Sequence, residues 1–268
     1  MNNLKAKVGK VVHTCASAYD KVRFSRNRRE FEPALPFRDA VSQFASRNRL
    51  YAYMHHYFSH HLPPALRAHR KYFSTRGRGF GEEAFHSMWY LLLKEFRPKK
   101  FLEIGVFRGQ VISLWALVGK IESIETDIHC ISPFAAVGDR VSDYASIDFL
   151  DDVTQNFRHF ELAEPQYIKA LSTDKRAVSH MQREKYDCIY IDGSHDYEVV
   201  LSDYRNSVAA LNTGGILVMD DSSLYTDFVP PAFSFAGHPG PSKVAREYAD
   251  RELTFVAGVG HQNIYRKP

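Results

Sequence analysis

Short apolar runs alternate with helical stretches from residue 101 to the end of this 268-residue sequence. Such an alternation is typical of βαβ units, in which the strands form a parallel sheet and the intervening helices cover both of its faces. The predicted fold class is therefore α/β. The strand-like runs are FLEIG at 101–105, SIETD at 123–127, QYIKA at 166–170, YDCIYID at 186–192 and GILVMDD at 215–221.

The C-terminal end of the chain follows another pattern. The strand-like runs LTFVAGVG and HQNIYRKP have almost nothing between them. A gap this short favours a β-hairpin over another helical crossover. We therefore expect a mostly parallel sheet that ends in an antiparallel hairpin.

The N-terminal part differs from the rest in charge. Residues 1–100 hold 20 Lys and Arg against 7 Asp and Glu, whereas residues 101–268 hold 15 against 24. Residues 1 to about 95 also have helical periodicity. We therefore expect a basic helical extension over residues 1–80 and a second domain over residues 81–268.

Two helices of the extension carry patterns of their own. The first has an apolar stripe at spacings of three and four, formed by Leu4, Val8, Val11, Cys15, Ala18 and Val22. We expect this stripe to pack on the rest of the protein or on a second subunit, which makes a homodimer reasonable, and not to bind a membrane surface. In the second helix, His56 and His60 have a metal-ligand spacing but no carboxylate motif nearby, which predicts a solvated helix face.

Nothing in the sequence suggests a membrane span or a secretory signal. No uncharged apolar run reaches 18 residues, and lysines interrupt the first 23 residues, where a signal peptide would need a compact apolar stretch. We therefore expect a soluble protein of the cytoplasm.

The segment FLEIGVFRGQ places Glu103 and Gly105 at the end of the first strand and Gly109 at the start of the next helix. A dinucleotide fingerprint would need glycine where Phe107 and Gln110 stand, which disfavours an NAD-dependent oxidoreductase. The carboxylate before the turn would repel a pyrophosphate and attract a cationic ligand.

Asp127, at the end of the run SIETD, follows Gly105 by 22 residues. An acid at the end of a second strand is placed to accept hydrogen bonds from the hydroxyls of a ribose.

Acidic residues also end two later strands. Asp192 ends one, and Asp220 and Asp221 end the next, so neighbouring parallel strands would bring three carboxylates into one crevice. These groups would repel one another unless a cation lay among them, and oxygen ligands suit Mg²⁺ or Ca²⁺. Without a metal, the same strand ends would line a cofactor pocket.

These residues resemble the class I S-adenosylmethionine-dependent methyltransferases, over roughly residues 80–268. The segment YDCIYIDGSHDYE, followed by LNTGG and a carboxylate pair, is similar to a subgroup that contains sugar and natural-product O-methyltransferases. The resemblance implies a Rossmann-like fold with a seven-stranded sheet. It also implies S-adenosyl-L-methionine as cofactor, with the glycine turn facing its methionine and sugar portions and Asp127 holding its ribose. In the run LSTD, Ser172 and Asp174 would contact the adenine edge.

The implied reaction is O-methylation of a hydroxyl on a saccharide or secondary metabolite. A metal would hold the acceptor hydroxyl and lower its pKa while His195 takes its proton. His195 could instead only brace its loop, and Asp196 is the second candidate for the base. A long segment at 128–165 predicts an extra amphipathic helix, and the Pro-, Gly- and Phe-rich stretch after Asp221 is a candidate acceptor lid.

Two other functions stay open. The basic first hundred residues would suit a nucleic-acid methyltransferase, although no nucleic-acid module is recognisable. A non-catalytic S-adenosylmethionine-binding protein is the other alternative.

Overall fold

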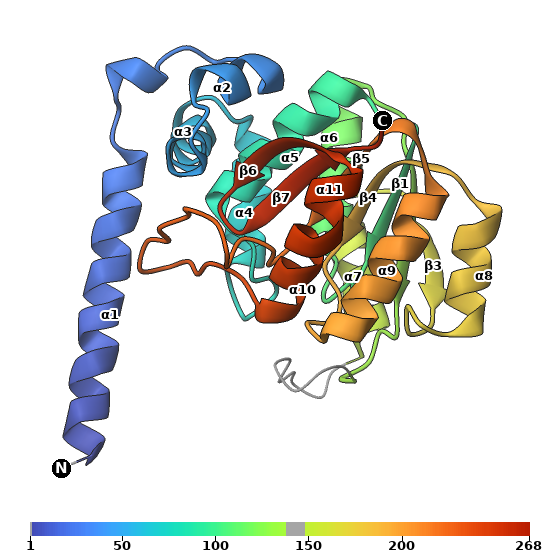
Figure 1. The fold of residues 1–268 in the computed structure, drawn as a ribbon. Coiled ribbons are helices and arrows are strands. Elements are labelled where there is room, and N and C mark those ends of the chain that lie inside the picture. The colour runs from blue at the N-terminus through green and yellow to red at the C-terminus, as the bar shows by residue number, and fades with distance from the viewer. Residues whose placement is uncertain (1, 138–147) are drawn as a thin grey trace.

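The computed structural model of the chain describes residues 2–137 and 148–268, with side chains from residue 11 onward. Its centre is a seven-stranded sheet with the order β3-β2-β1-β4-β5-β7-β6 (Figure 1). The first five strands are parallel, and β7 pairs antiparallel with both β5 and β6. This confirms the predicted α/β class and the C-terminal hairpin. The strands are β1 (Lys100–Ile104), β2 (Asp127–Ser132), β3 (Gln166–Lys169), β4 (Tyr186–Ile191), β5 (Leu211–Met219), β6 (Thr254–Val259) and β7 (Gln262–Arg266).

The predicted position of the second strand, residues 123–127, was wrong, because the strand lies at residues 127–132. Residue Ser123, with a φ of 52°, ends the preceding helix, and the strand begins only at Asp127. Its residues from Ile128 to Ser132 are all buried, as a central parallel strand requires. Residues 123–126 of the run SIETD instead form the connection that leads into this strand.

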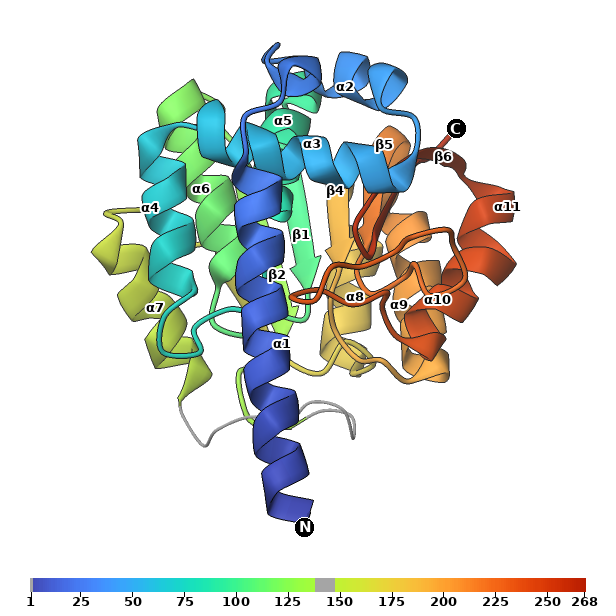
Figure 2. The same ribbon diagram turned by 90° about the vertical axis from the view of Figure 1, so that its left-hand side faces the viewer.

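Helices cover both faces of the sheet (Figures 1 and 2). Successive residues of a strand point to opposite faces, so in β1 Phe101 belongs to one hydrophobic cluster and Leu102 to the other. The first cluster includes residues of α5, α6 and α7, and the second includes residues of α8, α9 and α10. These helices are α5 (Glu83–Phe96), α6 (Gln110–Glu122), α7 (Phe149–His159), α8 (Lys175–Arg183), α9 (Tyr197–Ala210) and α10 (Pro239–Val244), which continues as η2 (Ala245–Ala249) and α11 (Asp250–Glu252).

Part of the long segment expected at 128–165, residues 138–147, lies outside the described residues. The amphipathic helix predicted there is α7, which buries Phe149, Val153 and Phe157 in the first cluster.

The helices before residue 80 share the core of the sheet. Residues Phe37, Tyr51 and Met54 belong to the same hydrophobic cluster as Phe101, so the core continues across residue 80. The division predicted at residue 80 therefore marks a change of charge along the sequence. These helices are α1 (Asn2–Ser25), η1 (Arg29–Phe31), α2 (Phe37–Gln43), α3 (Arg47–His60) and α4 (Pro64–Phe73).

One prediction for these helices was wrong. The histidines of α3 do not form a solvated face, because His55 and His56 are buried and pack against aromatic rings, including Phe24 and Phe31. In α1, Val11 and Val22 of the predicted apolar stripe are exposed, so the rest of the described chain does not cover them, and packing on a second subunit stays a prediction.

Among the described residues, none of the helices has both the length and the apolar character needed to cross a membrane.

Candidate functional site

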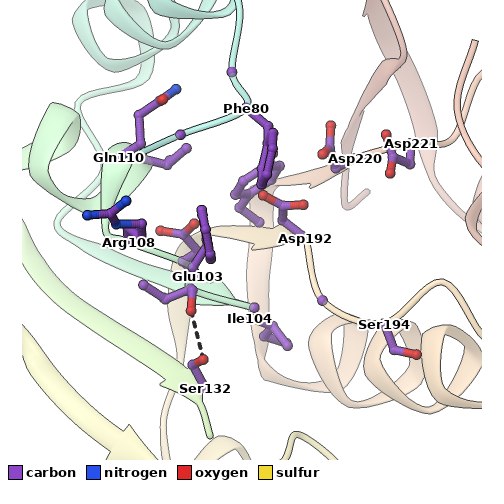
Figure 3. Close-up of a pocket in the computed structure, with 18 of the residues that line it drawn as sticks. Phe80, Glu103, Ile104, Arg108, Gln110, Ser132, Asp192, Ser194, Asp220 and Asp221 are labelled. Atoms are coloured by element: carbon purple, nitrogen blue, oxygen red, sulfur yellow. Dashed lines mark hydrogen bonds between the residues drawn. The ribbon is translucent and has the colours of Figure 1, made fainter. Parts of the chain in front are cut away.

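A cavity of about 750 Å³ lies at the carboxyl ends of the parallel strands. Its wall includes Glu103 at the end of β1, Asp192 after β4 and Asp220 after β5 (Figure 3). Ligands of open parallel sheets bind at this edge, where the loops after neighbouring strands converge. The sheet thus brings together carboxylates that the sequence separates by up to 117 positions, and we take this cavity as the candidate site.

Glu103 occupies the predicted place and points into the cavity (Figure 3). Its side chain is buried, and the residue is 3% exposed. Its Oε2 atom has no hydrogen-bond partner among the described residues. Burial raises the pKa of Glu103 to about 8, against the effect of a hydrogen bond from the backbone N–H of Ile112. A buried carboxyl with an unused oxygen is suited to a cationic ligand.

Gly105 and Gly109 shape the turn after β1. Both have positive φ angles, 95° and 78°, which L-residues with a side chain rarely adopt. A Cβ atom on Gly105 would lie 2.0 Å from the backbone oxygen of Asp192. The first glycine is therefore required for the close approach of the β1 and β4 ends, and Gly109 is the N-cap of α6.

Asp127 is not in the cavity, which corrects the prediction for this residue. It begins β2 and pairs in register with Lys100, the first residue of β1, so it lies at the opposite edge of the sheet. Its carboxylate contacts Lys100 and His129, at 3.2 and 3.0 Å. The residue that ends β2 beside the cavity is Ser132, whose hydroxyl donates to the backbone oxygen of Val106.

The two residues expected at the adenine edge are separated by the structure. Ser172 lines the cavity together with Leu171 and Thr173. The carboxylate of Asp174 turns back to accept a hydrogen bond from the backbone N–H of Leu171, at 2.9 Å. Asp174 is exposed and is not among the residues that line the cavity.

Asp192 and Asp220 lie next to each other in the cavity wall (Figure 3). Burial raises the pKa of Asp192 well above its usual value, and the carboxyl of Asp220 raises it further. Burial and then Asp221 raise the pKa of Asp220, while His261 opposes this shift. Two half-buried acids in such proximity favour a shared proton or a bound cation.

Asp221 faces two histidines. Its Oδ2 atom is 2.9 Å from Nε2 of His195 and 3.7 Å from Nε2 of His238. The two imidazole rings are 4.2 Å apart between centroids. His195 comes from the loop after β4, as predicted, whereas His238 comes from the stretch predicted as an acceptor lid. That stretch returns to the site because the backbone N–H of His238 donates to the backbone oxygen of Asp221, at 2.9 Å.

His261 is a site residue that the sequence reasoning missed. It lies in the turn between β6 and β7, and its Nε2 atom is 3.4 Å from Asp220 and 3.7 Å from Asp221. Burial alone would lower the pKa of His261, but the carboxylates of Asp220, Glu82 and Asp221 raise it above its ordinary value. The sequence signal that could have identified His261 was the predicted hairpin, because a hairpin beside β5 brings its turn close to the residues that follow β5.

The residues that could hold a metal ion are grouped differently from the prediction. In residues 2–137 and 148–268, two sets of ligand atoms lie within 4.8 Å of one another: His195, Asp221 and His238, and Asp220, Asp221 and His261. The predicted set of three carboxylates is not one of them. Asp221 belongs to both sets, and each set contains histidine.

A short segment before α5 covers another side of the cavity and was also missed. Phe80 stacks on Phe107 at 5.2 Å between ring centroids. The glycines on either side of Phe80 make room for Gln110, because a Cβ atom on Gly79 or Gly81 would lie 1.9 or 2.0 Å from that side chain. The available sequence signal was a phenylalanine between two glycines, at residues 79–81.

The chain is similar to known methyltransferases in sequence and in structure. The sequence model of a family described as "Methyltransferase domain" matches residues 102–222. An uncharacterized protein of Acanthamoeba polyphaga mimivirus is 26% identical over 132 residues. This match covers 48% of the chain and spans about half, 52%, of that relative.

Solved structures share the fold. The SAH-bound methyltransferase from Podospora anserina superposes with a TM-score of 0.56 at 13% identity, covering 88% of this chain and 98% of that one. A putative caffeoyl-CoA O-methyltransferase from Staphylococcus aureus gives 0.53 at 15% identity, with 77% and 93% covered. An O-methyltransferase from Bacillus cereus in complex with SAH gives 0.51 at 13% identity, with 77% and 92% covered.

Proposed function

We propose that the chain is a class I S-adenosylmethionine-dependent methyltransferase and that it methylates a hydroxyl group of a small-molecule or glycan acceptor. The match of residues 102–222 to a methyltransferase-domain model and the fold shared with solved methyltransferases support this proposal. The observation that carries the proposal is a histidine–carboxylate pair, His195 and Asp221, in the same cavity as the buried carboxyl of Glu103. The histidine–carboxylate pair suits the role of proton acceptor, and the carboxyl of Glu103 suits a cationic cofactor.

The cofactor fits the part of the cavity around the β1 turn. Glu103 offers an unused, buried carboxyl oxygen, and Gly105 and Gly109 keep the turn narrow. Ser132 and Ser172 offer hydroxyls to the cavity, and among the described residues that follow β2 and β3, none that lines the cavity is acidic. When bound, S-adenosylmethionine supplies the electrophilic methyl group.

His195 is the proposed base. In the tautomer that donates Nε2–H to Asp221, its Nδ1 atom carries the lone pair that accepts the acceptor's hydroxyl proton. Asp221 fixes this tautomer and stabilises the imidazolium that forms. Asp196 also lines the cavity but is exposed, so it stays the second candidate for the base.

A divalent metal ion is a further part of the proposal. Asp220, Asp221 and His261 would hold it, and Glu82, whose Oε1 lies 3.9 Å from Nδ1 of His261, would orient that imidazole. When bound, a metal ion lowers the pKa of a coordinated hydroxyl. Because one ligand is imidazole, Mn²⁺, Fe²⁺ or Zn²⁺ suits this set as well as Mg²⁺ does.

The experiment has a binding step and a transfer step. Calorimetry should detect S-adenosylmethionine and SAH but not NAD, and absence of all binding would reject the proposal. A screen of acceptor hydroxyl compounds with labelled methyl donor then identifies the acceptor. His195→Gln should lower kcat by roughly 10²- to 10⁴-fold with cofactor affinity unchanged.

The matched variants are Asp196→Asn and Glu198→Gln. Loss of kcat in the first variant together with normal kcat in His195→Gln would move the base role to Asp196. Glu198 is exposed on α9 and should behave as wild type. For the metal, activity that persists in chelator would reject the metal-assisted part alone.

A further inference from the structure

Helix α1 presents apolar side chains that nothing in the described chain covers. Val11, Val12, Tyr19 and Val22 are 62%, 62%, 65% and 55% exposed. With about 100° of rotation per residue, these positions fall within one band of about 100° around the helix. The exposed Cys15 lies in the same band.

The opposite face of α1 is the one attached to the protein. Asp20 accepts a hydrogen bond from the backbone N–H of Ala232 at 2.8 Å, and Ser17 donates to the backbone oxygen of the same residue at 3.3 Å. Phe24 packs against Tyr51 and Phe233. These contacts fix the rotation of the helix, so the apolar stripe faces outward. Figures 1 and 2 show that the N-terminal half of α1 extends beyond the body of the protein.

The charge around the stripe is strongly positive. Helix α1 (Asn2–Ser25) contains five Lys and Arg and one acidic residue, Asp20. That carboxylate already accepts the hydrogen bond from Ala232. Two copies of α1 packed stripe to stripe would bring these cations together with almost no compensating acid, so charge opposes self-association through this face.

We propose that α1 is an interfacial helix that binds the surface of an anionic phospholipid bilayer. Apolar residues along one side of a helix with Lys and Arg around them are the pattern of helices that lie in the headgroup region. Each Lys or Arg near such a surface adds attraction to anionic lipids. A nucleic acid would use the cations but has no use for a row of exposed valines.

The test measures binding to vesicles, so it does not depend on the proposed methyl transfer. The full chain is centrifuged with vesicles of phosphatidylcholine alone or with about a third phosphatidylglycerol. We expect binding to the anionic vesicles only, weakening as salt is raised. Val11→Ser combined with Val22→Ser should abolish most of it. Arg23→Gln combined with Arg26→Gln should weaken it about fivefold per charge removed.

The matched control is Thr14→Ser combined with Ala18→Ser, which changes the same helix without removing a large apolar side chain. All variants should keep the wild-type Tm, because the altered residues contribute little to the core. Equal binding to both vesicle types would overturn the proposal. A dimer detected by analytical ultracentrifugation would also overturn it, if the double Val→Ser variant dissociates that dimer. Tighter binding to duplex DNA would overturn it as well, if the same variant retains this binding.

Discussion

At the scale of the residue, Glu103 is a buried carboxyl in the candidate site. It ends β1 inside the cavity, and burial raises its pKa to about 8. At pH 7 the carboxyl of the ligand-free protein is therefore mostly protonated, whereas a cationic ligand favours its ionised form. Binding of such a ligand is accordingly coupled to the release of a proton.

We predict that Glu103→Gln lowers the affinity for S-adenosylmethionine by about tenfold to a hundredfold, the usual effect of losing a hydrogen bond to a charged group. In the wild type, the affinity should rise as the pH is raised toward 8, because ionisation of Glu103 then costs less. Calorimetry at several pH values measures both effects, and the pH dependence should be reduced in the variant.

Asp127→Asn and Asp174→Asn are the controls for this prediction. Both residues were sequence-based candidates, and the structure places both carboxylates away from the cavity. We expect affinities within about twofold of wild type. A large loss in Asp127→Asn would show that the ribose is held at the other edge of the sheet.

At the scale of the element, the β6–β7 hairpin supplies His261, and one arginine of α3 attaches this hairpin to the helical layer. Arg47 is buried and donates to the backbone oxygens of Gly260 and Gln262, at 2.9 and 3.1 Å, and to the side chain of Asn263. Gly258 leaves room for this side chain, because a Cβ atom there would lie 2.1 Å from the guanidinium carbon. The extension is therefore part of what positions the site.

Arg47→Met should lower the free energy of unfolding by about 3 kcal/mol, because it leaves buried carbonyl oxygens without donors. Urea denaturation measures this change. Arg49→Met is the matched control: Arg49 is exposed and pairs with Glu30 at 2.9 Å, so its loss should cost less than about 1 kcal/mol. Similar losses in the two variants would contradict the role given to Arg47.

At the scale of the whole molecule, several histidines are buried in the neutral form. Burial, together with Arg70, lowers the pKa of His69 to about 3, and burial followed by the neighbouring His60, His61 and Arg28 lowers that of His56 to about 4. In the unfolded chain a histidine titrates near 6.5. The unfolded state therefore binds more protons, and stability falls as the pH drops below about 6.5.

We predict that the wild type loses stability faster than His69→Gln as the pH falls from about 6 to 4. Removing one such histidine should change the slope by up to about 1.4 kcal/mol per pH unit. Urea denaturation across this range measures the difference between the two chains, which cancels the opposite contribution of buried acids such as Glu103. His13→Gln, at an exposed position of α1, should leave the slope unchanged, and equal slopes in all three chains would refute the prediction.

The sequence by itself determined the α/β class, the C-terminal hairpin, the turn after β1 and the loop after β4 that carries His195. These features involve local backbone conformation, such as the positive φ angles of Gly105 and Gly109 in the turn after β1, and local conformation leaves a pattern in consecutive residues. The candidates Glu103, Asp192, Asp220 and Asp221 were found in this way, because each directly ends or follows an apolar run.

The tertiary structure decided where the remaining residues act. A shift of one segment in β2 moved Asp127 to the opposite edge of the sheet, and the packing of the hairpin brought His261 to Asp220, 41 positions away. The apolar stripe of α1 was visible in the sequence, but periodicity does not show whether such a stripe is covered. Contacts from Ala232 and Phe233 to the opposite face decided this, because they fix the rotation of the helix.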